Sequence, residues 1–120
     1  MSLRAYQQTS ARAETPRQAE YRLFAQVTMA LISAAKLDRT DVVGRMDALD
    51  WNRRLWSALG ADCADPSNEL PAETRAGILS LALWVGRYTT EVIAGRDDIQ
   101  DLIDVNRMIM QGLSGEAVAA

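Results

Sequence analysis

The stretch DALDWNRRLW, residues 47 to 56, spaces its apolar residues three and four positions apart, which is the period of an α-helix. On a wheel of about 100° per residue, Trp56 lies on a broad apolar face and Asn52 falls in the middle of it. The members of this face are Val42, Met46, Leu49, Asn52, Leu55, Trp56, Leu59 and Cys63. The pattern predicts a helix with one buried face, and a buried amide then needs hydrogen-bond partners inside the fold.

Three residues of the same stretch lie away from the middle of this face. Arg53 lies near its edge, and Arg54 points away beside Asp50, so an ion pair between Arg54 and Asp50 is expected at the i, i+4 spacing. Trp51 also lies off the face. It either covers a neighbouring helix or the N-terminal arm, or it anchors a binding partner, and both interpretations stay open.

A second asparagine repeats the arrangement in LIDVNRMIMQGL, residues 102 to 113. Asn106 falls in the middle of an apolar face, Arg107 at its edge and Met108 on the opposite side. We expect Asn52 and Asn106 to find partners within the bundle and to fix the register of the helices, as a single buried asparagine does in coiled coils. The alternative is that the two amides form the polar floor of a ligand pocket.

Helical spacing and capping signals divide the whole chain into four long helices. Thr15, Pro16 and Gln18 form a capping-box pattern at the start of the first helix. The predicted helices are 16 to about 36, 40 or 41 to about 62, 71 to about 94, and 97 or 98 to about 112. We therefore predict an all-α helical bundle in one domain, residues 1–120, with a short N-terminal helix or arm (1–14) and a frayed tail (114–120).

Two further expectations concern burial in this bundle. The first helix should bury a face that consists of Tyr21, Phe24, Val27, Thr28, Leu31, Ile32 and Ala35. The third helix is apolar over more than half of its wheel. A helix of this kind is surrounded by neighbours, so we expect the third helix to be the central one.

Composition excludes several classes of function. The 120 residues carry a net charge of -3 and no histidine, and Lys36 is the only lysine. Nucleic-acid binders usually carry a basic surplus, which this chain lacks. Without histidine, both a catalytic triad and a common zinc site lose their usual residue. Cys63 is the only cysteine and lies on an apolar face. We therefore expect no enzyme, no metal and no cofactor.

The location of the protein is also suggested by its sequence. A single cysteine rules out an intramolecular disulfide, which fits a reducing compartment. The N-terminal segment has no apolar core of signal-peptide length. The longest nearly apolar run, residues 76–86, is too short to span a bilayer. We expect a soluble, cytoplasmic protein that does not insert into the membrane.

Several phrases, in order along nearly the whole chain, resemble the FlaF family of flagellar biosynthesis regulators. They are AYQQT (5–9), TPRQAEYRLF (15–24), LDWNRRLW (49–56), LP (70–71), ILSLALWV (78–85) and LIDVNRMIMQGL (102–113). The resemblance implies an all-α cytoplasmic protein that promotes flagellin synthesis or secretion by binding flagellin as a chaperone. It also implies work alongside FlbT, a regulator of flagellin mRNA, and it implies no cofactor. The ends of flagellin are amphipathic segments that assemble as helices.

A helical bundle can offer such a segment a groove that reads apolar residues at helical spacing. The candidate partner-binding residues are Trp51 and Met108, which lie off the apolar faces of their helices and would serve as anchors, and Arg54 and Arg87, which would form the rim. Two other functions stay open. One is a direct RNA-binding regulator of flagellin mRNA, which neighbouring arginines and tryptophans favour and the acidic balance opposes. The other is a structural dimerisation module.

Overall fold

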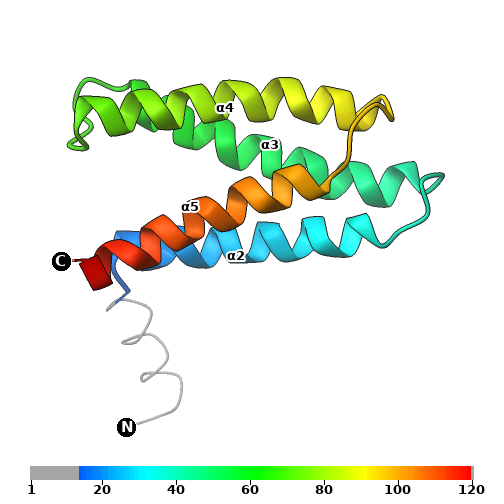
Figure 1. The fold of residues 1–120 in the computed structure, drawn as a ribbon, viewed down its shortest axis with the longest axis horizontal. Helices are drawn as coiled ribbons and strands as arrows, with labels where there is room; N and C mark the ends of the chain where they lie inside the picture. Colours follow the sequence, from blue (N-terminus) through cyan, green and yellow to red (C-terminus); the bar gives the residue numbers. More distant parts are fainter. Residues whose placement is uncertain (1–13, 120) are drawn as a thin grey trace, which may run out of the picture.

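Four α-helices make up the fold of this computed structural model, which describes residues 14–119 and the side chains of residues 14–112. They are α2 (Pro16–Ala35), α3 (Val42–Ala64), α4 (Ala72–Ile93) and α5 (Gln100–Ala119), and this described part of the chain contains no strand. Short loops join successive antiparallel helices (Figure 1). The predicted all-α bundle of four long helices is confirmed. The predicted N-terminal arm lies outside the described residues, apart from Glu14.

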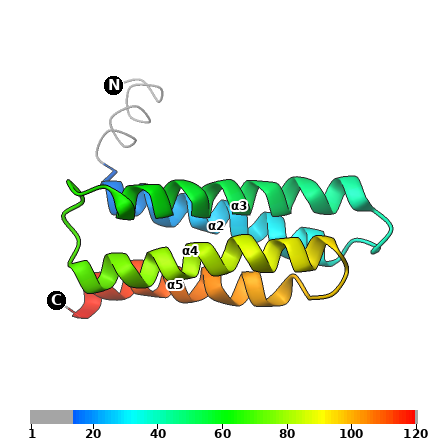
Figure 2. The same cartoon turned by 90° about the horizontal axis from the view of Figure 1, so that it is seen from above.

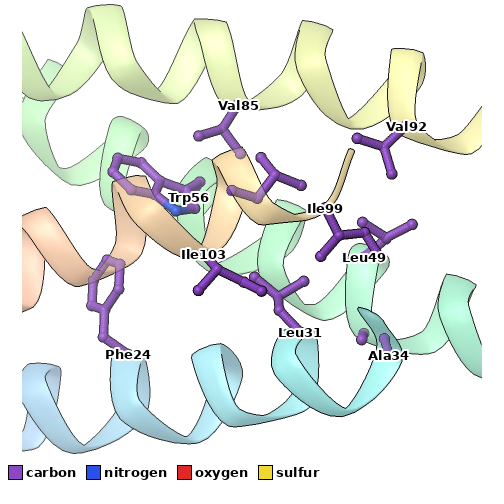
Figure 3. Packing of buried hydrophobic residues seen from close by; sticks show 11 residues of the cluster. Phe24, Leu31, Ala34, Leu49, Trp56, Val85, Val92, Ile99 and Ile103 are labelled. Carbon is purple, nitrogen blue, oxygen red and sulfur yellow. The ribbon is translucent and has the colours of Figure 1, made fainter. Parts of the chain in front are cut away.

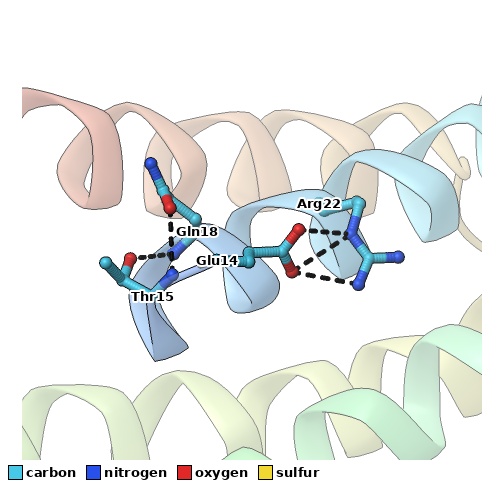
Figure 4. Close-up of polar contacts among 4 residues, drawn as sticks. All are labelled: Glu14, Thr15, Gln18 and Arg22. Carbon is cyan, nitrogen blue, oxygen red and sulfur yellow. Dashed lines mark hydrogen bonds and ion pairs between the residues drawn. The ribbon is translucent and has the colours of Figure 1, made fainter. Parts of the chain in front are cut away.

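Local sequence fixes the start of α2. The hydroxyl of Thr15 accepts a hydrogen bond from the backbone N–H of Gln18 at 3.1 Å, and the Gln18 side chain accepts one from the Thr15 N–H at 2.9 Å (Figure 4). Pro16 occupies the first helical turn, where its missing N–H costs nothing. The carboxylate of Glu14 reaches along the helix to Arg22 at 3.0 Å. The capping box predicted from residues 15–18 is therefore present.

The helices form a ring in the order α4, α3, α2, α5 that is closed on three sides. α3 packs along both α2 and α4, and α2 packs along α5, whereas α4 and α5 meet only marginally. α4 and α5 lie close together near their connecting loop and diverge toward the other end of the bundle (Figure 1), while Figure 2 shows the four helices from above. Near the loop the Tyr88 hydroxyl donates to the carboxylate of Asp101 and lies 3.1 Å from the carbonyl oxygen of Asp98. The fourth side of the ring is therefore closed at one end only.

The core lies inside this ring and draws on all four helices (Figure 3). Trp56 of α3 is its largest fully buried side chain and meets the ring of Phe24 edge to face, with the centroids 5.7 Å apart. Such edge-to-face pairs add to the stabilisation that comes from burying the two rings. Other buried members are Leu31, Ala34, Leu49, Val85, Val92, Ile99, Leu102 and Ile103.

The expectation that the third long helix is central is wrong. α4 lies at the open side of the ring, and only Val85, Thr89 and Val92 of its side chains are fully buried. Leu83 on its outer side is 65% exposed. The helical wheel places the apolar positions of α4 correctly, but it does not show whether the other helices bury these side chains or leave them exposed to solvent.

Three smaller expectations also differ from the structure. α5 continues past Gly112 to Ala119, because one glycine weakens a helix without having to end it and alanine-rich EAVA follows. Val42 and Tyr21, which share their wheels with core residues, are both exposed. Val42 is the first residue of α3 and Tyr21 lies in the second turn of α2. Ala35, expected on the same buried face as Tyr21, is also exposed, at the end of α2. Residue 120 lies outside the described part of the chain.

Candidate partner-binding surface

A cluster of buried polar side chains links three helices in the interior. Asn106 of α5 accepts a hydrogen bond from the indole N–H of Trp56 at 2.9 Å. The amide group of Asn106 donates to the amide oxygen of Asn52 at 2.8 Å and to the hydroxyl of Thr28 at 3.2 Å. That hydroxyl donates in turn to the sulfur of Met110 at 3.7 Å. The cluster joins α2, α3 and α5 and includes no residue of α4.

Both asparagines are fully buried, as their places on the wheels predict. Asn106 uses its oxygen and both of its amide hydrogens, so its bonding capacity is nearly filled. Asn52 accepts one bond, while its amide nitrogen finds no partner among the described residues. Neither asparagine lines any of the three hollows described below, so none of these hollows has the two amides as its polar floor. The proposed role in helix register remains a prediction.

The four candidate partner-binding residues do not form one site. Arg54 and Arg87 are exposed on α3 and α4, and Arg54 pairs with Asp50 at 3.1 Å, as predicted. Trp51 and Met108, which are 37% and 53% exposed, border two different hollows. The off-face pattern therefore found exposed residues, but the tertiary structure separates them.

Trp51 borders a shallow, almost wholly apolar hollow between α2 and α3. The walls of this hollow come from small residues on both helices, and its members are Ala30, Ser33, Ala34, Leu37, Gly44, Asp47, Ala48 and Trp51. The indole of Trp51 thus lies beside the first long helix, which was one of its two interpretations. With 37% of its surface exposed, the same ring remains accessible to a partner.

Met108 borders a larger cavity, which we call the end groove, where α4 and α5 have diverged. It has a volume of about 490 Å³ and receives side chains from all four helices and from the loop between α3 and α4. Its apolar residues are Phe24, Leu59, Cys63, Leu70, Ile78, Met108 and Ile109. This size and lining are typical of a site that takes part of an apolar ligand or a partner's side chains.

Charged residues at the rim of the end groove are mainly acidic. Glu20 of α2, Asp62 of α3 and Asp65 of the following loop line it together with Arg17. Burial raises the pKa of Glu20 above its ordinary value, the nearby Asp62 carboxylate raises it further, and Arg17 lowers it. Hydrogen bonds from the backbone N–H and hydroxyl of Ser67 hold the pKa of Asp65 below its ordinary value. The rim therefore carries more negative than positive charge at neutral pH.

Cys63, the only cysteine of the chain, lines the end groove. Burial, and then the charge of Asp62, raise its pKa above the ordinary value for a thiol. A protonated, buried thiol behaves as a small apolar side chain. Cys63 thus contributes to an apolar surface rather than to nucleophilic chemistry.

A third hollow, of about 280 Å³, lies at the opposite end of the bundle. Arg39, Arg45, Asp97 and Asp98 contribute charges of both signs to it, around an apolar floor that includes Leu49 and Ile99. Its balanced charge gives no preference for one class of ligand. The end groove has the larger volume and the clearer chemical character.

Sequence reasoning found only Met108 among the residues that line the end groove. The one signal for an open side was the third long helix, which contributes Ile78 to the groove and has more apolar positions than a bundle of four helices covers. An excess of this kind indicates either a central helix or a helix beside an open groove. The spacing alone does not distinguish these two, because it says nothing about which neighbours are present.

Among residues 14–119, no helix is long and apolar enough to cross a bilayer, and no cluster of histidine, cysteine and carboxylate side chains has the makings of a metal site. The family model described as "Flagellar protein FlaF" matches residues 2–113, which is nearly the whole chain. No curated protein and no solved structure matches the chain.

Proposed function

The chain belongs to the FlaF family of flagellar proteins, and from this premise we propose that it promotes flagellin synthesis or secretion by binding flagellin as a cytoplasmic chaperone. The end groove is the observation that carries this proposal. It combines an apolar floor of about 490 Å³ with an open side between α4 and α5. A site of this shape suits a helix that presents one apolar face before it assembles elsewhere.

Met108 and Ile78 show how such a helix would be held. They stand on the two helices that diverge, and both line the groove. A helix placed between them would contact α4 on one side and α5 on the other, and so would occupy the open side of the ring. The flexible thioether of Met108, 53% exposed, adapts to apolar side chains of different shapes. In this role the protein is a binding module and not an enzyme.

Purified protein and purified flagellin test the proposal directly. We expect a stoichiometric complex in size-exclusion chromatography and a measurable affinity in calorimetry. Met108→Asp places a charge in the end groove and should weaken the complex at least about tenfold, the loss expected when a buried apolar contact is replaced by an unpaired charge. Trp51→Ala tests the hollow between α2 and α3 in the same assay. Absence of any complex with the unmodified protein would refute the proposal.

The two variants also locate the site. If Trp51→Ala weakens the complex and Met108→Asp does not, flagellin binds beside α2 and α3 and the end groove has another use. Both side chains are at the surface, so neither variant should unfold the bundle, which circular dichroism checks. A pull-down from cell extract with the same proteins asks whether FlbT accompanies flagellin.

Direct RNA binding is the second candidate function. Its sequence signal was the pair Arg53 and Arg54 between two tryptophans, but both guanidinium groups pair with Asp50, at 3.3 and 3.1 Å. Trp56, one of the two tryptophans, is buried. These contacts reduce the positive charge that this stretch offers to phosphates. Binding of flagellin leader RNA in a gel shift, lost as salt is raised, would favour this function over the first.

A structural dimerisation module is the third candidate. The outer side of α4 supports it, because Leu83 is 65% exposed there. One exposed leucine is common on the surfaces of monomeric proteins, so this support is weak. Multi-angle light scattering on the purified protein distinguishes a monomer from a dimer.

A further inference from the structure

We propose that the end groove selects a partner helix that carries a lysine or arginine next to its apolar face, and that this cation is held at the rim between Glu20 and Asp62. The inference rests on the proposed function for the natural partner, whereas the chemistry of the bound segment is argued from the groove itself. It adds a charge requirement to what would otherwise be recognition of apolar surface alone.

The helical form of the occupant follows from the open side of the ring. α4 and α5 each present apolar side chains to the groove, Ile78 from one and Met108 and Ile109 from the other. Two diverging helices with apolar inner sides form a trough, and a third helix fits such a trough through residues at i, i+3, i+4 and i+7. The middle turns of a helix satisfy their own backbone hydrogen bonds, so their burial in an apolar trough leaves no peptide group of those turns unpaired.

The preference for a cation is inferred from two carboxylates on neighbouring helices, Glu20 of α2 and Asp62 of α3. Glu20 and Asp62 both line the groove, and the charge of Asp62 raises the pKa of Glu20. The two carboxylates therefore repel each other, and a cation placed between them would be attracted by both. Arg17 supplies part of this compensation on the same rim, while Asp65 adds a further negative charge. One more positive charge is therefore favourable there.

Other occupants fit less well. A second copy of the chain has 16 acidic against 13 basic residues and a net charge of -3, so its overall charge opposes its approach to an acidic rim. A nucleic acid would bring its phosphates against Glu20, Asp62 and Asp65. Electrostatic complementarity thus favours a basic amphipathic helix over both.

Two synthetic peptides of ~18 residues, about five helical turns, provide the test. They share one apolar face and differ only in flanking residues, which are lysine in one and glutamate in the other. Fluorescence anisotropy of the labelled peptides with the full-length protein should give an affinity for the lysine peptide at least about tenfold higher at low salt. This preference should shrink as salt is added, because rim charges are screened.

Variants then place the charge preference. Glu20→Gln and Asp62→Asn should each reduce the preference for the lysine peptide several-fold and leave the glutamate peptide unchanged or slightly tighter. Asp47→Asn is the matched control, because it removes the same charge from the same helix as Asp62→Asn but at the hollow beside Trp51. Equal affinity for the two peptides, or an equal effect of Asp47→Asn and Asp62→Asn, would overturn the inference.

Flagellin binding by the same variants separates this inference from the proposed function. If flagellin binds the unmodified protein and is insensitive to Glu20→Gln and Asp62→Asn, the charge requirement is wrong and the chaperone proposal stands. If the lysine peptide binds as expected and flagellin does not bind, the groove has the proposed chemistry and its natural partner is a different protein. A dimer in light scattering whose groove no longer binds either peptide would identify a second copy as the occupant and overturn the inference.

Discussion

The side-chain amide of Asn106 donates a hydrogen bond of 2.8 Å to the amide oxygen of Asn52, and so joins α5 to α3 in the interior of the bundle. Asn106 also accepts a hydrogen bond from the indole N–H of Trp56, the largest fully buried side chain. The two asparagines therefore differ in importance, although the wheels place them alike. Asn106 holds three partners on two other helices, whereas Asn52 contributes one acceptor.

Asn106→Leu should destabilise the protein far more than Asn52→Leu. The first change leaves the Trp56 N–H without an acceptor inside the core and leaves the amide oxygen of Asn52 without a donor. We expect a loss of about 2–4 kcal/mol in the free energy of unfolding. The second change leaves one Asn106 amide hydrogen without its acceptor but also removes an amide nitrogen that has no partner, so the two effects partly offset each other and the net cost should be about 1 kcal/mol. Urea unfolding followed by circular dichroism measures both values.

The same pair of variants tests the role in helix register. If Asn52→Leu raises the melting temperature and leaves the oligomeric state unchanged, Asn52 does not fix register. Equal losses for the two variants would instead contradict the unequal sharing of hydrogen bonds described above.

Tyr88→Phe should loosen the closed end of the α4–α5 pair. The variant loses the hydrogen bond from the hydroxyl to Asp101, and we expect a loss of about 0.5–1.5 kcal/mol in unfolding free energy. Burial, and then this bond, raise the pKa of Tyr88 above its ordinary value of 10.0. The contribution is therefore complete below that value and is lost as the pH rises through the raised pKa.

Tyr21→Phe is the control for this experiment, because Tyr21 is an exposed tyrosine on α2, away from the α4–α5 junction. Its effect should lie within about 0.5 kcal/mol, as for most surface changes. Similar effects of the two variants at neutral pH would show that the Tyr88 hydroxyl does not stabilise the junction.

Gly60→Ala and Gly77→Ala should have opposite effects. A methyl group at Gly60 would lie 3.1 Å from the Cβ of Ala82, which is attached directly to the backbone of α4 and has no freedom to move aside. At Gly77 a methyl group meets nothing within 4 Å. We expect Gly77→Ala to stabilise by about 0.5–1 kcal/mol through helix propensity, and Gly60→Ala to destabilise by about 1 kcal/mol through overpacking.

A double-mutant cycle checks the cause of the Gly60 effect. Adding Ala82→Gly to Gly60→Ala removes the close contact, so the two changes together should cost less than the sum of their separate costs. If the two changes are strictly additive in the free energy of unfolding, the close contact between α3 and α4 does not cause the loss of stability in Gly60→Ala.

Glu20→Gln should stabilise the protein slightly at neutral pH and have no effect in acid. Because the folded state raises the pKa of Glu20 above its ordinary value of 4.5, the folded state binds this proton more tightly than the unfolded state. Stability from Glu20 is therefore present below 4.5 and is lost as the pH rises through the raised pKa. Glu20 is largely exposed, so the gain from glutamine should be a few tenths of a kcal/mol.

The difference between the unmodified protein and Glu20→Gln isolates this group, because Asp65 and Glu91 respond to pH in the opposite sense. Hydrogen bonds hold the pKa values of both below their ordinary values. Suppose that the difference in stability between the unmodified protein and Glu20→Gln does not change from pH 3 to pH 7, about the interval over which a carboxyl group ionises. The folded state would then not raise the pKa of Glu20.

Local residues made much of the fold predictable. The capping box at Thr15 and Gln18, the loop from 65 to 71 and the three- and four-residue apolar spacing act over a few positions, so a single sequence displays them. The burial of Asn52 and Asn106 was predictable for the same reason. The prediction for α4 was wrong because the number of apolar residues on a helix can be read from that helix alone, whereas their burial depends on which other helices pack against them.

The candidate site was predictable to a smaller extent. Met108 was found because it lies off the apolar face of its helix, and it does line the end groove. Glu20, Asp62 and Ile78 were not found, since each looks like an ordinary member of its own helix. They become a site only where the ends of α2, α3 and α4 meet.

By itself the sequence determined four helices, their approximate limits and much of the buried side of α2, α3 and α5, because periodicity and capping are local. Only the tertiary structure decided that Asn106 pairs with Asn52, that α4 stands at an open side, and that acidic residues from separate helices share one rim. The physical reason is that packing sets distances between residues that are far apart in the chain. Hydrogen bonds, grooves and repulsion between charges depend on those distances.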